Sequence, residues 1–274
     1  MVNNPLAQTP VDGENVAVRL FHMVKSRLGP EDPPRTSTPQ SSGFGRSHRL
    51  DPTILREYDI RGIVGENLDE ADAQAIGRAF ASMARERKGT RPVICVGYDG
   101  RLSSPDLEAA LVEGLVASGA DALRVGLGPT PMLYFATHIL GADGGVMITG
   151  SHNPPEYNGI KMVLGGASFY GAAIQDLGRR VAAGDLAAGA GGARAVSVSE
   201  EYVARLIQDA GPDLDLSAAW DPGNGAAGGI VGDLRLRDIE DGDIAEGLFG
   251  LPEPVGELLG PIAVSETTVS AHPV

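Results

Sequence analysis

The chain has 274 residues, of which 42% are apolar and 21% charged, enough for one large domain or two ordinary ones with packed cores. Its formal net charge of −14 argues against a nucleic-acid-binding protein, because a phosphate backbone requires a basic surface. No stretch reaches the roughly 20 apolar residues of a membrane span. The N-terminus lacks the succession of basic, apolar and small residues that marks a secretory signal. We therefore expect a cytoplasmic protein that binds neither nucleic acid nor membrane.

The single cysteine, Cys95, excludes an intrachain disulfide. It lies in the apolar run Val93-Ile94-Cys95-Val96, which predicts a buried side chain rather than a reactive thiol.

The first 49 residues are predicted to be a disordered leader. One helix-like stretch covers residues 16–28, and a tract rich in serine, threonine, proline and glycine follows it to Gly45. Such a tract buries too little apolar surface to offset the entropy lost on ordering. A partner-binding helix and a start codon placed too early are the alternatives for this segment.

Residues 50–185 are predicted to form a three-layer α/β/α domain with a mostly parallel sheet. Apolar residues at helical spacing predict helices at 69–87, 105–118, 130–140 and 172–182. Short apolar runs predict strands at 92–98, 122–125, 145–149 and 159–163. Ser104 is the expected N-cap of the second helix and Pro105 its first residue. Strand–helix–strand units this short imply parallel strands joined by right-handed crossovers.

After this domain the sequence predicts a linker and an unfinished second domain. Residues 186–195 are mostly glycine and alanine, the composition of a flexible linker. A helix at 199–209 and a strand ending at Asp221 begin an incomplete α/β domain over residues 196–230, and residues 231–274 form an acidic, divergent tail. Such an incomplete domain would expose apolar side chains, which predicts self-association. These side chains include Trp220, Ile230 and Val231.

One loop concentrates polar chemistry: Thr149-Gly150-Ser151-His152-Asn153-Pro154-Pro155-Glu156-Tyr157-Asn158-Gly159-Ile160-Lys161. It follows an expected strand, at the edge where open parallel sheets bind ligands. The two prolines stiffen the loop and hold Ser151 outward, and Lys161 can neutralise an anion. Chemistry alone leaves three interpretations of Ser151: a hydrolase nucleophile with His152 as base, part of a structural turn, or a phosphorylatable serine beside cations. The hydrolase is disfavoured because the Gly-x-Ser-x-Gly elbow is absent.

This loop strongly resembles the active-site signature of the α-D-phosphohexomutase superfamily, the phosphomannomutase and phosphoglucomutase enzymes. Other segments fit in the expected order. They are Arg56-Glu57-Tyr58-Asp59-Ile60-Arg61-Gly62, similar to the N-terminal active-site loop, Gly97-Tyr98-Asp99-Gly100-Arg101-Leu102-Ser103-Ser104, similar to the loop after the next strand, and Gly128-Pro129-Thr130-Pro131, similar to the turn before the third helix. The resemblance covers residues 50–185. Asp221-Pro222-Gly223-Asn224-Gly225-Ala226-Ala227-Gly228 resembles the start of the family's second domain.

The resemblance implies phosphoryl transfer between C1 and C6 of a hexose phosphate, mannose or glucose, through a phosphoserine and a bisphosphate intermediate. Ser151 would carry the phosphoryl group, and His152 and Lys161 would flank it. Arg61 and Tyr58 would approach it from the N-terminal loop, with an ordinary surface loop pair as their alternative. Phosphoryl transfer needs positioning and charge neutralisation, which cations around one serine supply.

The phosphate loop implied by the resemblance also includes Asn153, Asn158 and Arg101. From its place in the turn, Arg101 is interpreted as a structural anchor as well. Asp59 and Asp99 are expected to act as acceptors that fix their loops.

The resemblance further implies Mg²⁺ and a hexose 1,6-bisphosphate activator, and here the sequence departs from the family. Family members hold Mg²⁺ with three aspartates of an Asp-Gly-Asp-Gly-Asp-Arg loop and with an oxygen of the phosphoserine. Asp241-Gly242-Asp243 is a fragment of that pattern and is interpreted as a solvated acidic turn, which leaves a phosphoryl oxygen on Ser151 as the expected ligand. We therefore expect a phosphohexomutase represented by a truncated or frameshifted chain. The alternative is a non-catalytic remnant that binds a phosphosugar or a partner.

Overall fold

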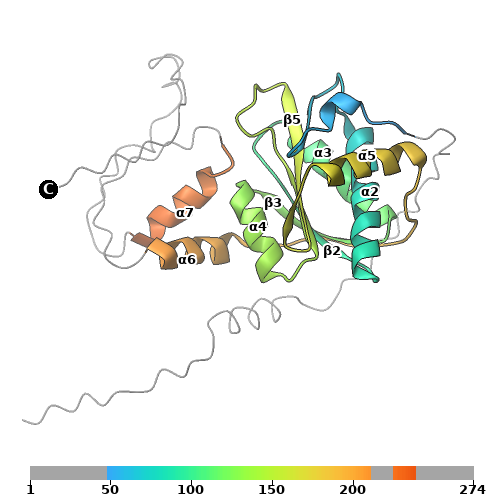
Figure 1. Cartoon of the computed structure of the whole chain (residues 1–274). Helices are drawn as coiled ribbons and strands as arrows, with labels where there is room; N and C mark the ends of the chain where they lie inside the picture. The colour runs from blue at the N-terminus through green and yellow to red at the C-terminus, as the bar shows by residue number, and fades with distance from the viewer. Residues whose placement is uncertain (1–47, 211–224, 239–274) are drawn as a thin grey trace, which may run out of the picture.

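A mixed sheet of seven strands, covered by helices on both faces, is the framework of the computed structural model, which describes residues 48–210 and 225–238 (Figure 1). The strand order is β1-β5-β4-β2-β3-β7, and β6 also pairs with β5. The strands are β1 (Ile60–Ile63), β2 (Val93–Tyr98), β3 (Asp121–Leu127), β4 (Gly144–Ile148), β5 (Tyr157–Leu164), β6 (Ala167–Phe169) and β7 (Ala193–Ala195). The helices are the 3₁₀ turn η1 (Pro52–Ile54), α2 (Glu70–Lys88), α3 (Ser104–Ala117), α4 (Thr130–Ile139), α5 (Ala172–Ala183), α6 (Ser199–Ala210) and α7 (Gly228–Asp238).

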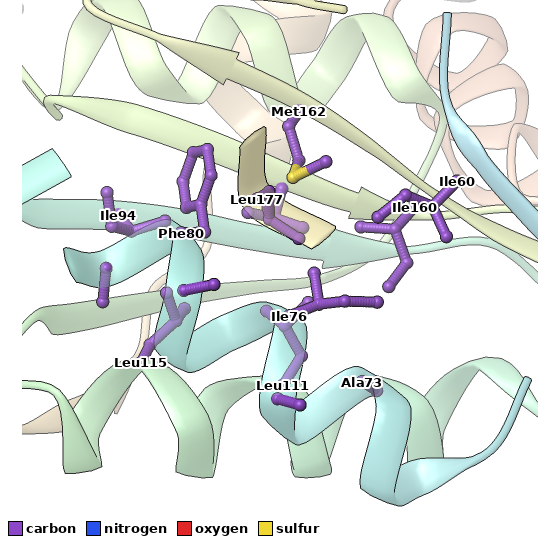
Figure 2. Close-up of a cluster of buried hydrophobic side chains, with 14 of the residues drawn as sticks. Ile60, Ala73, Ile76, Phe80, Ile94, Leu111, Leu115, Ile160, Met162 and Leu177 are labelled. Atoms are coloured by element: carbon purple, nitrogen blue, oxygen red, sulfur yellow. The ribbon is translucent and has the colours of Figure 1, made fainter. Parts of the chain in front are cut away.

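Two apolar clusters fill the space on the two faces of the sheet. Helices α2, α3 and α5 cover one face, where Phe80, Leu115 and Leu177 pack on strand residues such as Ile94 and Ile160 (Figure 2). Helices α4, α6 and α7 cover the other face, with a second cluster that includes Cys95, Leu123, Leu133, Val203 and Ile230. Strand residues alternate between the two clusters because successive side chains point to opposite faces. The predicted three-layer α/β class is confirmed.

The direction of β5 differs from the expectation of parallel pairing. Strand β2 pairs in parallel with β3 and β4, and β3 in parallel with β7. Strand β5 runs antiparallel to β4, β1 and β6. The connection from β4 to β5, residues 149–156, is shorter than the dozen or so residues of a parallel crossover, so the chain returns as a hairpin. This hairpin holds the Ser151 loop between two central strands.

Residues 186–195 are not the flexible linker predicted from their composition. The Ala187 amide donates to Ser82 Oγ at 2.8 Å, the Gly191 amide donates to Val116 O at 2.9 Å, and residues 193–195 form the edge strand β7. A Cβ atom on Gly191 would overlap the Ala120 carbonyl. The small glycine and alanine side chains therefore allow this segment to pack closely against the domain. A closely packed segment of this kind has the same composition as a flexible linker.

Helices α6 and α7 pack on the same body as the first domain. The helix predicted at 199–209 is confirmed as α6. Ile230 and Val231 in α7 are 7% and 9% exposed, so the prediction that they are exposed is wrong, and the reason is their packing in α7 beside α6. Trp220, the strand ending at Asp221, residues 1–47 and residues 239–274 lie outside the described residues. Of the helices described, none is both long and apolar enough to cross a membrane.

The Cys95 thiol is predicted to be inert in the folded protein. It is fully buried, as expected from the sequence, and burial raises its pKa from 9.0 to about 12. Because the thiolate is the reactive form, such a shift lowers its population about a thousandfold. Labelling by a disulfide reagent at mildly alkaline pH should stay slow until denaturant unfolds the domain, and then reach one thiol per chain. Rapid labelling of the native protein would contradict this burial.

Candidate active site

Two loops that are distant in sequence meet at one edge of the sheet because the strands before them are parallel neighbours. Tyr98 of β2 pairs with Ile148 of β4, so the residues that follow them, Asp99 and Thr149, begin side by side. The Gly150 amide donates to Asp99 Oδ2 at 3.0 Å, and the Asp99 amide donates to the Ile148 carbonyl at 2.9 Å. Sheet register thus brings together two of the segments that were singled out in the sequence.

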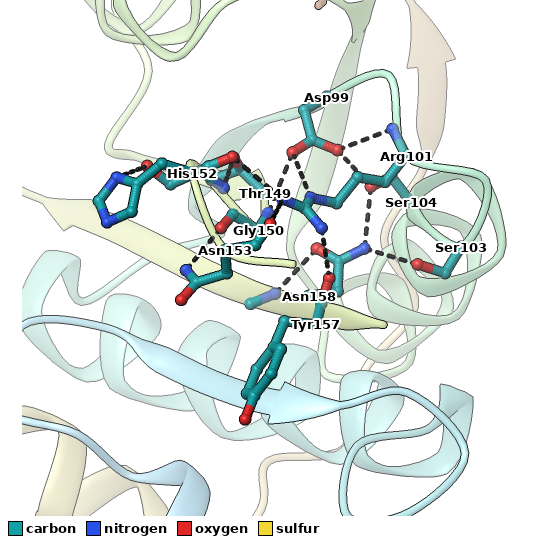
Figure 3. A network of polar contacts seen from close by, with 12 residues as sticks. Asp99, Arg101, Ser103, Ser104, Thr149, Gly150, His152, Asn153, Tyr157 and Asn158 are labelled. Atoms are coloured by element: carbon teal, nitrogen blue, oxygen red, sulfur yellow. Dashed lines mark hydrogen bonds and ion pairs between the residues drawn. The ribbon is translucent and has the colours of Figure 1, made fainter. Parts of the chain in front are cut away.

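Arg101 fills the inside of the Ser151 loop (Figure 3). Its Nη1 donates to the carbonyls of Pro154 and Tyr157, at 2.7 and 2.9 Å. Its Nη2 donates to the carbonyls of Ser151 and Asn153, at 3.0 and 2.6 Å. Its Nε lies 3.4 Å from Asp99 Oδ2, and the side chain is 15% exposed. Both terminal nitrogens are occupied by the loop backbone, so Arg101 acts on the conformation of the loop, as the anchor interpretation expected.

The turn at Ser151 has an unusual backbone conformation. Ser151 has φ +54°, the left-handed region, and it is the one non-glycine residue with positive φ among residues 48–210 and 225–238. The Ser151 amide donates to Thr149 Oγ1 at 2.9 Å, and Asn153 holds the Gly150 carbonyl through both its amide and its side chain, at 3.1 and 2.7 Å. A Cβ on Gly150 would overlap the Arg101 guanidinium, so this position requires glycine.

The Ser151 hydroxyl is exposed and has His152 as its neighbour. The distance between Ser151 Oγ and His152 Nδ1 is 3.3 Å. In the part of the chain that is described, no carboxylate contacts His152 to orient its ring. A serine hydrolase needs that third group, so the geometry argues against the hydrolase interpretation of Ser151.

Two cations are held next to the loop by one buried carboxylate. Asp59 is 6% exposed; it accepts a hydrogen bond from Arg61 Nη2 at 2.7 Å, and the Lys161 ammonium lies 3.4 Å from its Oδ2. Arg61 Nη1 also donates to Asn153 Oδ1 at 3.3 Å. The antiparallel pairing of β1 with β5 brings Arg61 and Lys161 onto neighbouring strands. Within this group of three side chains, two positive charges stand against one negative charge, and Arg61 contacts the Ser151 loop at Asn153.

Asn158 and Ser104 hold the loops of the site in place through hydrogen bonds. Asn158 is fully buried, and its side-chain amide donates to the hydroxyls of Ser103 and Ser104, each at 2.9 Å. The expectation that Ser104 caps α3 is wrong. Ser103 occupies the cap position, and the Ser104 hydroxyl instead donates to Asp99 Oδ1 at 2.6 Å. These contacts tie the start of β5 to the loop after β2.

Tyr58 lies on the surface, 74% exposed, and its ring stacks on Tyr170 with centroids 6.3 Å apart. The Gly171 amide donates to the Glu57 carbonyl at 2.6 Å and so fixes the same loop. Sequence reasoning missed Tyr170, because no local pattern connects it to a residue so far away in the chain.

A cleft of about 1050 Å³ opens over this loop. Its walls come from the Ser151 loop, the loop after β2, the turn before α4 and the segment before α7. The residues lining it include Ser151, Asn153, Arg101, Met147, Thr130 and Ala226. Such a volume accommodates a small ligand of the size of a phosphorylated sugar. Nowhere in residues 48–210 or 225–238 do three or more His, Cys, Asp or Glu side chains gather in a way that could hold a metal ion.

The family model that matches the chain and two of its sequence relatives all carry the names phosphoglucomutase or phosphomannomutase. The family model described as phosphoglucomutase/phosphomannomutase, alpha/beta/alpha domain I, matches residues 52–187. A phosphomannomutase/phosphoglucomutase of Pseudomonas aeruginosa is 42% identical over 185 residues, which are 68% of this chain and 40% of that protein. A phosphoglucomutase of Neisseria meningitidis serogroup B is 43% identical over 183 residues, which are 66% of this chain and 39% of that protein.

A solved structure agrees with the sequence relatives. The crystal structure of a phosphoglucomutase/phosphomannomutase family protein from Burkholderia thailandensis matches with a TM-score of 0.60 and 41% identity, over 68% of this chain and 42% of that one. The chain thus spans about two fifths of the length of these relatives. Through the domain at residues 52–187, the chain belongs to the phosphohexomutase superfamily.

Proposed function

We propose that Ser151 carries a phosphoryl group in a phosphohexomutase reaction on a hexose phosphate. The observation that supports this most directly is the exposed Ser151 hydroxyl, held in a left-handed turn, in a loop that Arg61 contacts at Asn153 while Asp59 anchors both Arg61 and Lys161. The relatives that match this domain are named phosphomannomutase and phosphoglucomutase, so mannose and glucose phosphates are the first substrates to test. Glucosamine phosphate comes after them.

The proposed reaction consists of two phosphoryl transfers, and each forms one P–O bond as another breaks. In the first, a sugar hydroxyl oxygen forms a bond to phosphorus as the bond from phosphorus to Ser151 Oγ breaks, which gives a hexose 1,6-bisphosphate. In the second, Ser151 Oγ forms a bond to the other phosphorus as its bond to the sugar oxygen breaks. The proton lost by the sugar hydroxyl in the first step is returned to a sugar oxygen in the second. His152 Nδ1, 3.3 Å from Oγ, is positioned to hold a proton between the steps.

Charge neutralisation is the main contribution proposed for the described residues. A phosphoryl group passing through a loose transition state spreads negative charge over its oxygens. The side chains of Arg61 and Lys161 are 29% and 31% exposed, so each can turn part of its charge toward such a group while Asp59 keeps it in place. A hexose 1,6-bisphosphate is the proposed source of the phosphoryl group on Ser151.

The magnesium expected from the resemblance does not fit the residues described. Without a cluster of three acidic or imidazole side chains in those residues, only a phosphoryl oxygen on Ser151 would offer a ligand there. Asp241 and Asp243 lie outside the described residues. A cytoplasmic location is part of the same proposal, since phosphorylated sugars are retained there by their charge.

The full chain should become phosphorylated on Ser151 when it is incubated with glucose 1,6-bisphosphate. Peptide mass spectrometry should place the added phosphate on this serine and find none there in S151A. Replacing Lys161 by alanine should slow the phosphorylation about 10²–10³-fold, because one cation is lost from the transition state. Lys88→Ala removes a lysine that pairs with Asp143 elsewhere on the surface and serves as the matched control.

A wild-type chain that stays unphosphorylated would refute the phosphoserine proposal. Calorimetry with glucose 1-phosphate would then test the alternative, a domain that binds a phosphosugar without reaction. Conversion of glucose 1-phosphate to glucose 6-phosphate, with Mg²⁺ and a trace of the bisphosphate, tests the complete reaction beside S151A.

The left-handed conformation at Ser151 predicts a stability difference between two variants. S151A and S151G both remove the hydroxyl, but only glycine adopts positive φ without a steric cost. In urea unfolding, S151G should therefore be about 1 kcal/mol more stable than S151A. Equal stabilities, or a more stable S151A, would show that the turn is not strained.

A further inference from the structure

The hydrogen bonds of Arg101 determine where one backbone amide of the loop points. Arg101 Nη2 draws the Ser151 carbonyl toward itself at 3.0 Å. That carbonyl and the N–H of His152 belong to one planar trans peptide and therefore point in opposite directions. The His152 N–H must face away from the guanidinium. Figure 3 shows the His152 ring on the side of the loop away from Arg101. The ring Nδ1 lies 3.3 Å from Ser151 Oγ.

The amides on either side of His152 are already occupied. The Ser151 amide donates to Thr149 Oγ1, and the Asn153 amide donates to the Gly150 carbonyl. The next two residues, Pro154 and Pro155, have no N–H to offer. Among the described residues, the His152 amide has no acceptor. The turn thus presents a single unused N–H directly after the serine that is proposed to carry the phosphoryl group.

We propose that Arg101 is a positioning residue that directs the His152 amide toward the phosphoryl group on Ser151. The inference rests on the proposed function, because the anion it describes is the one carried by Ser151. An N–H aimed in advance at a phosphoryl oxygen needs no reorganisation during transfer. The role of Arg101 is geometric rather than electrostatic, since Asp99 lies 3.4 Å from its Nε and its terminal nitrogens are engaged by backbone carbonyls.

Geometry and charge predict different results for lysine at position 101. The planar guanidinium donates to four carbonyls at once, whereas an ammonium has three donors around a single nitrogen. If Arg101 acted by charge, R101K would retain most of the effect. Because it acts by shape, R101K should behave almost as R101A does.

Gly150 offers an independent way to disturb the same contact. A Cβ at this position would overlap Nε and Cζ of Arg101. G150A should therefore reproduce the defect of R101A, and the double variant should be no worse than either single one, because both remove the same interaction.

The direct test is an NMR titration of the full-length chain, labelled with ¹⁵N, with inorganic phosphate as the probe. In the wild type, the His152 amide signal should move downfield and saturate, and the affinity for phosphate should fall at least about tenfold in R101A, R101K and G150A. Methylguanidinium should restore part of the affinity in R101A, where the space is empty, but not in G150A. Arg180→Ala, which removes an arginine of α5 that pairs with Glu86 of α2, should leave the titration unchanged.

Two outcomes would overturn the proposal. One is a stationary His152 signal in the wild type, whether or not phosphate binds elsewhere, and the other is a wild-type affinity for phosphate in R101K. Should R101A fail to fold, as thermal unfolding would show, R101K and G150A carry the test. Incubation with glucose 1,6-bisphosphate distinguishes failure of the proposed function from failure of the Arg101 proposal. Absence of phosphoserine in a wild type whose His152 amide responds to phosphate would refute the proposed function and leave the positioning by Arg101 supported.

Discussion

The Arg101 guanidinium lies between the loop after β2 and the loop after β4, and the geometry of the site follows from its contacts. It gathers four backbone carbonyls on one side, while Asp99 compensates its charge and also accepts from the Gly150 amide. The Arg101 side chain is 15% exposed, and a charge with so little access to water needs a paired charge and satisfied hydrogen-bonding groups, both of which it has here. The guanidinium leaves no room for a Cβ atom at position 150, so this position requires glycine. The next residue, Ser151, has the left-handed conformation, and its hydroxyl is exposed.

The antiparallel return of β5 gives the site its second component. Because β5 lies between β4 and β1, a single strand leads from the Ser151 loop to Lys161 and places Arg61 on the neighbouring strand. Asp59 then holds both cations at one point. A hairpin at the centre of the sheet also fixes both ends of the loop, so the serine is held by packed strands rather than by a surface loop of its own.

The site therefore divides two tasks between different arginines. Arg101 has its donors engaged inside the loop and sets its shape. Arg61 and Lys161 share Asp59 as their partner and each keeps part of its side chain accessible, and Arg61 also contacts Asn153 of the Ser151 loop. This division suits the transfer of a phosphoryl group, for which positioning and charge stabilisation supply most of the catalysis. A net charge of −14 for the whole chain does not argue against such a site, since the field that acts on a small anion is set by the charges close to it.

Local patterns in the sequence determined the α/β class, the helices α2 to α6 and the importance of the segment around Ser151. Helical periodicity and a dense motif are properties of neighbouring residues, so they can be read without a structure. Tertiary structure alone decided the direction of β5, the ordered path of residues 186–195, the burial of Ile230, and the contacts of Arg101, whose carbonyl partners are 50 to 56 positions away. The physical reason is that each of these depends on packing and hydrogen bonds between segments distant in the chain, which composition and spacing do not encode.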